Sequence, residues 1–270
     1  MRPAPLTLQA RHLVPIAAPP IDGGWLRIER GRVVAVGKGR PPGPTVDLGD
    51  AVILPGLVNA HTHLEFSTVP QPLAAAGGLP AWISRVVALR RQRPPDSAAA
   101  ETAGAVARGR AESAAAGVTA IGEIATAASL EAYAAPGPRV RVFREALGLS
   151  PATNAAAFAA TIRDLDALRA HGIPAGVSPH APYSVASALG RRLLATARAR
   201  GLPAAMHLAE SREEEMLLAG GTGPFRELLE SLGAWPAAAP PRLLSTADWI
   251  SCLARGPRGI VVHGTHLDRD

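Results

Sequence analysis

Two histidines separated by one residue, His61 and His63, end an apolar segment that begins at Leu57. We expect this segment to be a β-strand, and residues two apart in a strand project from the same face. The two imidazoles therefore share one small volume, where they could ligate a divalent ion such as zinc, iron or nickel. A pair of this kind is weak evidence for a metal site when taken alone, so the positions of the other histidines must be considered with it.

Three further histidines, His180, His207 and His263, also end apolar segments that we expect to be strands. In a parallel barrel the carboxyl ends of the strands meet at one mouth, which is where barrel active sites are built. The sequence thus predicts that these imidazoles converge. His12 and His171 lie away from such ends, and we expect both on the surface.

Glu210 follows His207 by three residues, just beyond the expected strand end. From there a carboxylate can reach a metal-bound water without ligating the metal, and a metal lowers the pKa of such a water from 15.7 toward about 7. Glu210 could then take the proton and pass it to a leaving amine. A second interpretation is that Glu210 is an acidic residue that complements the dipole of a helix starting near Ser211.

The elements that must position these residues fall into two regimes. Up to residue 54, short alternating runs are broken by turn residues, which is typical of a small β module. The Pro55-Gly56 turn then ends this regime, so we expect residues 1–54 to be part of a β-sandwich and residues 55–270 to be a second domain. The expected strands of the first part are Leu6 to Val14, Trp25 to Glu29, Arg32 to Val36 and Thr45 to Leu54.

After Leu57, strand-like runs alternate with alanine-rich helical stretches, which predicts an α/β fold of repeated βα units around a parallel sheet. The expected strands are Leu57 to His63, Val118 to Ala125, Val140 to Leu147, Ala175 to His180, Ala204 to Ala209 and Ile260 to His263. Helical spacing is kept by Trp82, Ile83, Val86 and Val87 and by Phe158, Ile162, Leu165 and Leu168, while Asp96 and Ser245 are expected to cap helices.

Six strands fall short of the eight that close a (β/α)₈ barrel. We therefore expect a TIM-type barrel that is truncated after about six strands, preceded by the small β-sandwich module. On this expectation the 270 residues are a fragment, incomplete at the C-terminus.

Four segments carry a pattern that is specific when they are taken together. They are Pro55-Gly56-Leu57-Val58-Asn59-Ala60-His61-Thr62-His63-Leu64, Pro179-His180-Ala181-Pro182-Tyr183, His207-Leu208-Ala209-Glu210 and His263-Gly264. Together they resemble the aminohydrolase branch of the amidohydrolase superfamily, which holds cytosine and guanine deaminases and triazine chlorohydrolases. The opening segment Gly31 to Gly37 is similar to the first strands of that family's accessory β-sandwich.

The resemblance implies a metal-dependent hydrolase of carbon–nitrogen bonds other than peptide bonds, which deaminates a small nitrogenous substrate with a ring amidine. It also implies a role for each residue: His61, His63 and His207 as metal ligands, Glu210 as proton shuttle, His263 as the group that orients water and His180 as a substrate contact. The cofactor would be one divalent ion, zinc in the first place and iron in the second. The family's aspartate ligand after the eighth strand has no match, and neither Asp268 nor Asp270 is assigned to that role.

Two alternatives stay open within this resemblance, and a third lies outside catalysis. Some superfamily members bridge two metals through a carboxylated lysine on the fourth strand, but the only lysine, Lys38, precedes the barrel, which favours a mononuclear centre. Glu145 could instead ligate a metal, as in a cyclic amidase or an N-acetyl deacetylase, although we expect it to be an ordinary pocket acid. The third alternative is an inactive, incomplete barrel.

The composition and the sequence patterns favour a small-molecule substrate as the partner of this protein. The formal charge is +6, but the basic residues are scattered without aromatic interleaving, so no nucleic-acid partner is expected. No signal peptide and no apolar stretch of about 18 residues is present, which favours the cytoplasm and no membrane partner. The single cysteine, Cys252, follows no strand, so nucleophilic catalysis by a thiol is not supported. A homo-oligomer stays open.

Overall fold

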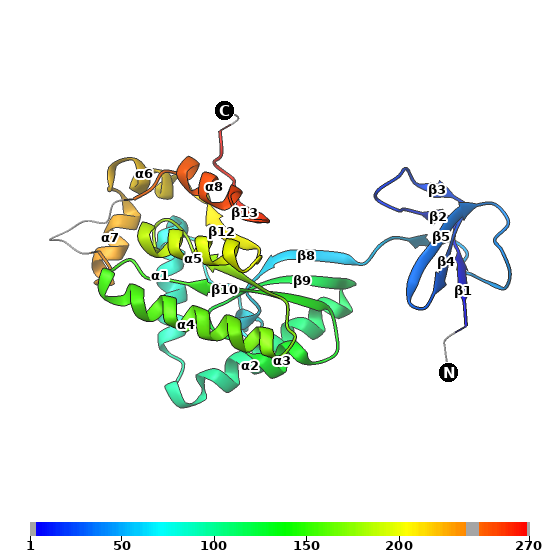
Figure 1. The fold of residues 1–270 in the computed structure, drawn as a ribbon, viewed down its shortest axis with the longest axis horizontal. Coiled ribbons are helices and arrows are strands. Elements are labelled where there is room, and N and C mark those ends of the chain that lie inside the picture. Colours follow the sequence, from blue (N-terminus) through cyan, green and yellow to red (C-terminus); the bar gives the residue numbers. More distant parts are fainter. Residues whose placement is uncertain (1–3, 236–242, 269–270) are drawn as a thin grey trace. The chain divides into compact units, whose positions relative to one another are not determined.

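The computed structural model describes residues 4–235 and 243–268. The chain divides into two compact units, Met1–Leu57 and Val58–Asp270 (Figure 1). The described part of the first unit consists of strands and their connections, whereas the second alternates strands with helices. The α/β class predicted from the sequence is confirmed.

The first unit contains two small sheets. A four-stranded sheet has the order β5-β4-β1-β6, and a three-stranded sheet has the order β3-β2-β7. Strands β4 and β5 form a hairpin across Arg30 and Gly31, which both have positive φ, as a tight two-residue hairpin turn requires. The strands are β1 (Leu6–Gln9), β2 (His12–Leu13), β3 (Ile21–Asp22), β4 (Gly24–Glu29), β5 (Arg32–Lys38), β6 (Thr45–Asp47) and β7 (Val52–Ile53).

The second unit is built on a six-stranded sheet in the order β13-β12-β11-β10-β9-β8, so neighbours in space are neighbours in the chain. The pairs from β9 to β13 are parallel, as βα units require. Strands β11 and β12 are buried along their whole length, as central strands covered on both faces are. The strands are β8 (Leu57–Thr62), β9 (Val118–Ala125), β10 (Arg139–Ala146), β11 (Ala175–Pro179), β12 (Ala204–Leu208) and β13 (Gly259–His263).

Helices follow the strands, and two of their predicted ends can be checked. Ser245 is the N-cap of α8 and forms a capping box with Asp248, as predicted. The prediction for Asp96 is wrong, because α2 begins at Pro95 with Pro94 as N-cap, and proline is favoured at the first helical position. The helical elements are η1 (Leu64–Phe66), α1 (Gly78–Arg91), α2 (Pro95–Ala115), α3 (Leu130–Ala134), α4 (Pro151–Ala170), α5 (Ser187–Ala199), α6 (Arg212–Gly220), α7 (Pro224–Ser231) and α8 (Thr246–Ala254).

The two faces of the sheet have different surroundings. Val142 of β10 belongs to a core cluster that includes Leu165 and Leu168 of α4. The next residue, Phe143, instead packs with Ala205 and other strand residues on the opposite face. Since side chains in a strand alternate, residues two positions after Phe143 and Ala205 continue along this inner face toward the carboxyl ends of the strands.

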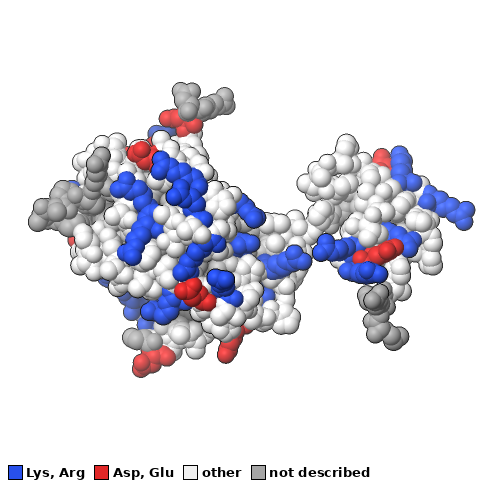
Figure 2. Space-filling view, in the orientation of Figure 1, with Lys and Arg blue, Asp and Glu red and all other residues white. Residues whose placement is uncertain are grey.

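Two global features complete the fold. Among the described helices, none combines the length and the apolarity that crossing a bilayer needs. On the face drawn in Figure 2, basic side chains of the second unit form separate patches with a few acidic side chains between them.

Candidate active site

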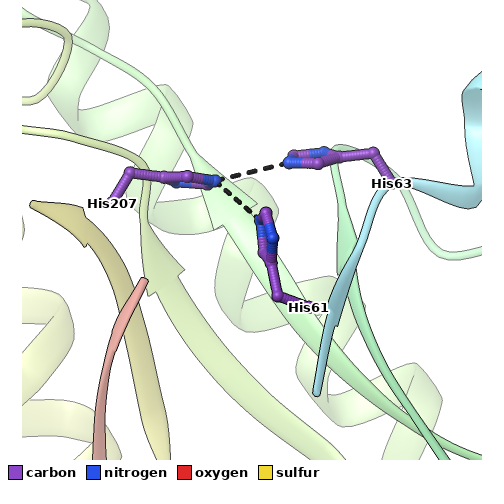
Figure 3. Close-up of side chains that lie close together, drawn as sticks. All are labelled: His61, His63 and His207. Carbon is purple, nitrogen blue, oxygen red and sulfur yellow. Dashed lines mark hydrogen bonds between the residues drawn. The ribbon is translucent and has the colours of Figure 1, made fainter. Parts of the chain in front are cut away.

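Three imidazoles from two strands meet at the carboxyl end of the sheet. Nε2 of His207 lies 3.0 Å from Nε2 of His61 and 3.4 Å from Nε2 of His63 (Figure 3). His61 and His63 come from the end of β8, and His207 lies two residues after the inward-facing Ala205 of β12. The strand alternation thus aims all three rings at one point, where their nitrogen atoms lie within 4.8 Å of one another.

The spacing of these nitrogen atoms fits a divalent metal. Two ligands at about 2.0–2.1 Å from a tetrahedral ion lie about 3.4 Å apart, close to the two distances seen here. Nδ1 of His207 donates to the backbone carbonyl of His180 at 3.0 Å, so the lone pair of the neutral ring is on Nε2, which faces His61 and His63. Such a carbonyl partner is the usual support of a metal-binding histidine.

The protonation of the cluster also suits a metal, because only neutral imidazoles ligate one. Burial, followed by the nearby His61, lowers the pKa of His63 to about 3. Burial also lowers the pKa of His207 well below its usual value, and His180 and His63 add to the effect. Burial lowers the pKa of His61 as well. All three rings are therefore neutral near pH 7.

Glu210 lies in the same cavity as the histidine cluster. Its Oε1 is 3.2 Å from Nε2 of His263, and its Oε2 accepts a hydrogen bond from the hydroxyl of Tyr183 at 3.4 Å. Burial raises the pKa of Glu210 to about 7, and the Tyr183 hydrogen bond opposes this rise. A carboxyl group with such a pKa can both accept and return a proton near neutral pH.

The backbone around Glu210 is held by a second acid, Glu214. Its carboxylate accepts the backbone N–H groups of Ala209 and Glu210 at 3.0 and 3.1 Å. Ala209 has a φ of 51°, in the left-handed region that non-glycine residues rarely adopt. Ser211 caps α6 by accepting a hydrogen bond from the backbone N–H of Glu214. Ser211 therefore caps the helix, and the side chain of Glu210 lines the cavity instead.

His263 reaches the cluster by a local break in the strand pattern. The preceding Val262 packs on the inner face with Ala205, so a regular strand would direct His263 to the opposite face. The φ of His263 is 70°, and this turn carries its ring to 5.4 Å from that of His61, measured between ring centroids. Its position beside Glu210 depends on that backbone conformation.

His180 and Glu145 occupy the side of the cavity next to His207. Nδ1 of His180 lies 2.5 Å from Oγ of Ser184, and its ring centroid is 4.9 Å from that of His207. Glu145, two residues after the inward-facing Phe143, is 1% exposed and lines the cavity, as expected of a pocket acid. Glu145, His180 and His207 form a second set of donor atoms within 4.8 Å of one another, so the metal-ligand alternative for Glu145 has a geometric basis.

The cavity has a volume of about 590 Å³, and most of its wall is apolar. The histidines and Glu210 line it together with residues of α1, α7 and the segment after β10. Arg90 is its only arginine or lysine among the described lining residues. The apolar wall residues include Trp82, Ile83, Val86 and Val87 of α1 and Phe225, Leu228 and Leu229 of α7.

Several buried acids near the site were not singled out in the sequence. Glu123 of β9 accepts the backbone N–H of Leu64 at 2.9 Å, which fixes the turn after His63. Glu65 in that turn pairs with Arg90 at 2.6 Å. Charged residues inside apolar strand runs, such as Glu123 in Val118–Ala125, were the available signal, because such residues are rarely buried without a partner.

Comparisons with known proteins agree with this architecture. A family model described as "Amidohydrolase family" matches residues 52–270. An aminodeoxyfutalosine deaminase of a Nitratiruptor species is 30% identical over 188 residues, covering 67% of this chain and 44% of the relative. A 5-methylthioadenosine/S-adenosylhomocysteine deaminase of Nitratidesulfovibrio vulgaris (Miyazaki F) is 31% identical over 230 residues, covering 79% and 51%. The chain spans about half the length of these curated relatives.

Solved structures share the fold. Helicobacter pylori aminofutalosine deaminase in complex with methylthio-coformycin superposes with a TM-score of 0.75 at 20% identity, covering 92% of this chain and 61% of that one. An adenosine deaminase from Xanthomonas campestris with bound zinc gives a TM-score of 0.59 at 21% identity, covering 94% and 61%. Both agree with the incomplete TIM-type barrel predicted from the sequence.

Proposed function

Because the chain belongs to the amidohydrolase family, we propose that it carries the active site of a metal-dependent deaminase that acts on an adenine-type nucleoside. One observation supports this most directly: three neutral imidazoles converge in a mostly apolar cavity that Glu210 also lines. In the same proposal, residues 55–270 are the hydrolase barrel and residues 1–54 are part of the accessory β-sandwich.

His61, His63 and His207 would hold one divalent ion, with zinc favoured because imidazole suits it and a fold relative binds it. When bound, such an ion supplies Lewis acidity, which makes water acidic near neutral pH. No further ligand is assigned among the described residues.

Side chains of this protein would carry out proton transfer, orientation of the water and contact with the substrate. Glu210, with its pKa near 7, takes a proton from the attacking water and passes it to the leaving amine. His263, 3.2 Å from Glu210, orients that water. His180 contacts the ring of the substrate from the side of β11. The product would be a carbonyl compound and ammonia.

The substrate class follows from the relatives and from the cavity wall. Both curated relatives are named as deaminases, and one is named for 5-methylthioadenosine and S-adenosylhomocysteine. Most of the wall around the rest of the cavity is apolar, which disfavours charged substituents because their desolvation is not repaid. We therefore expect 5-methylthioadenosine to be preferred to S-adenosylhomocysteine, whose amino acid group is charged.

The test uses the full chain loaded with zinc and assays ammonia release from 5-methylthioadenosine, S-adenosylhomocysteine and adenosine. Turnover of 5-methylthioadenosine at the highest kcat/KM supports the proposal. Absence of turnover with all three, in protein that has bound about one zinc per chain, would contradict it. Binding of no metal would remove its basis.

A further inference from the structure

The hydrogen of the His180 ring can be located from the groups around it. Nδ1 of His180 lies 2.5 Å from Oγ of Ser184, and both residues line the cavity. Ser184 is in the turn after β11, where its backbone carbonyl accepts the N–H of Gly148 at 2.9 Å. Burial lowers the pKa of His180 to about 3, so the ring is neutral near pH 7 and carries one hydrogen, on either Nδ1 or Nε2. Its location decides whether the ring accepts or donates a hydrogen bond in the cavity.

The hydroxyl group of Ser184 has two neighbours that could accept its hydrogen. One is Nδ1 of His180, and the other is the backbone carbonyl of Ala181 at 3.2 Å. That carbonyl already accepts the backbone N–H groups of Ser184 and Val185, both at 3.1 Å, and a carbonyl oxygen has two lone pairs. The shorter contact therefore takes the hydrogen. Ser184 donates to Nδ1, so the hydrogen of the His180 ring is on Nε2.

The Nε2–H group of His180 has no acceptor among the described residues. Oε1 of Glu145 is 3.8 Å from Nε2, which is beyond hydrogen-bond distance. Nε2 nevertheless keeps some accessible surface, whereas both carboxylate oxygens of Glu145 are enclosed by protein. The side chain of His180 is 18% exposed. A ligand in the cavity can therefore reach the Nε2–H group, although it cannot reach the carboxylate behind it.

The second set of donor atoms in the cavity, formed by Glu145, His180 and His207, lacks a free lone pair on His180. The Nδ1 lone pair is engaged by the hydroxyl of Ser184, and Nε2 carries the hydrogen. A ring nitrogen must offer a lone pair to bind a metal. His180 is therefore suited to donate to a substrate rather than to ligate an ion.

We propose that Ser184 is a positioning residue that holds His180 as the Nε2–H tautomer, so that His180 donates a hydrogen bond to a ring nitrogen of the substrate. This inference rests on the proposed nucleoside deaminase. The unsubstituted ring nitrogens of an adenine-type base have a lone pair and no hydrogen, so they pair only with a donor. The other tautomer of His180 would direct one lone pair at another. The hydroxyl of Ser184 thus selects a base that offers an acceptor at this point.

The tautomer can be measured without turnover, by NMR of zinc-loaded protein with ¹⁵N-labelled histidine. The His180 ring, identified by the loss of its signals in His180→Gln, should show a bare Nδ1 and a protonated Nε2. Ser184→Ala should shift both signals toward those of free histidine, and Ser184→Thr, which keeps a hydroxyl, should restore them. A hydrogen on Nδ1 in wild type, or unchanged signals in Ser184→Ala, would overturn the proposal.

Turnover tests the hydrogen bond to the substrate. The probes are 5-methylthioadenosine and its 3-deaza and 7-deaza analogues, which each replace one ring nitrogen by C–H. On the first probe, Ser184→Ala should lower kcat/KM by about 10-fold, mainly through KM, and Ser184→Thr should recover most of this loss. On the analogue that lacks the accepted nitrogen, wild type should already show a loss, and Ser184→Ala should add less than about threefold. Equal losses by Ser184→Ala on all three probes would contradict the inference.

Ser150 provides the matched control. It also lines the cavity, but its hydroxyl accepts the backbone N–H of Ala152 at the start of α4. Ser150→Ala should change neither the His180 signals nor the ratios of kcat/KM among the three probes. A change as large as that in Ser184→Ala would show that the effect is not specific to Ser184, which overturns the assignment.

Failure of the proposed function can be told apart from failure of this inference. If wild type turns over no probe, the proposed function fails, and the NMR signals still decide the tautomer. Calorimetric binding of the same probes then replaces kcat/KM. Affinities that show no coupling between Ser184→Ala and either ring nitrogen would overturn the inference.

Discussion

The Nε2 atoms of His207 and His61 lie 3.0 Å apart, although 146 positions separate the two residues in the chain. Strands β12 and β8 carry them, and three further strands lie between these two in the sheet. Contact between the two rings therefore requires the sheet to curve, so that the carboxyl ends of non-adjacent strands approach one another. The candidate metal site is in this sense a product of the curvature.

Removal of either ring should abolish metal retention. We expect His61→Ala and His207→Ala to weaken zinc binding by more than the roughly 10- to 100-fold that loss of a supporting hydrogen bond costs. The measurement is zinc per chain after dialysis against a weak chelator. His171→Ala is the control, because His171 is an exposed residue at the end of α4. Full zinc content in both cluster variants would refute the assignment of the ligands.

Replacement of the proton carrier should separate chemistry from metal binding. Glu210→Gln should keep zinc and substrate affinity while kcat falls by about 10²- to 10⁴-fold, because the amide cannot take up a proton. The assay is steady-state ammonia release with zinc measured on the same sample. Glu215→Gln, an exposed acid of α6, should behave as wild type. A kcat for Glu210→Gln within a factor of about two of wild type would exclude the role.

The buried acid behind the site should make stability depend on pH. Burial raises the pKa of Glu123 from 4.5 to about 8, so the folded state keeps a proton that the unfolded state loses above pH 4.5. The free energy of unfolding should therefore fall as pH rises from about 5 to 8. Glu123→Gln removes this contribution, because an amide does not titrate and its oxygen can still accept the N–H of Leu64.

Urea unfolding at pH 5, 6.5 and 8 tests this. The stability of Glu123→Gln relative to wild type should increase with pH across that range. Glu145, Glu210 and Glu214 have pKa values raised in the same direction, so some pH dependence should persist in the variant. A constant difference between variant and wild type at all three pH values would show that Glu123 does not titrate as described.

A glycine beside the first histidine strand should be intolerant of a side chain. A Cβ on Gly122 of β9 would overlap the backbone carbonyl of Ala60, so the alanine variant must push β8 away from β9. We expect Gly122→Ala to cost about 1–3 kcal/mol and to weaken zinc binding, since Ala60 precedes His61. Gly104→Ala, in an open part of α2, should instead stabilise by about 0.5–1 kcal/mol. The measurement is thermal unfolding of both variants. Equal Tm values would contradict the close approach of Gly122 to the backbone of Ala60.

The strands of the second unit were predicted well because each contains a short run of apolar residues, and in β11 and β12 this run is buried along its whole length. The bounds of β9 match the prediction, β10 differs by one residue at each end, and the other four strands differ by one residue at one end. The first unit was predicted less well. Leu6 to Val14 and Thr45 to Leu54 were each expected as one strand, yet the structure divides both, the second around Gly49 with its positive φ. The short strand β3 was not predicted, since two residues carry no periodic signal.

The sequence predicted only those residues of the candidate site whose positions follow from the ends of the strands. Convergence of His61, His63 and His207 follows from strand alternation in a parallel sheet. The prediction for His263 relied on the same rule, although its ring reaches the site through a positive φ that no pattern in the sequence reveals. The hydrogen bonds of Glu214 and Glu123 depend on which backbone groups tertiary packing brings near, and this cannot be read from local sequence.

The left-handed conformations of Ala209 and His263 restrict how this protein could change over evolutionary time. Each costs of order 1 kcal/mol or more for a residue with a Cβ, and both lie at the end of a strand that carries reactive groups. Glycine would relax either position, but it would also widen the range of orientations open to Glu210 or delete an imidazole. Substitutions at these two positions that favour folding should therefore lower turnover. We expect position 209 to accept only small residues and position 263 to accept no residue other than histidine.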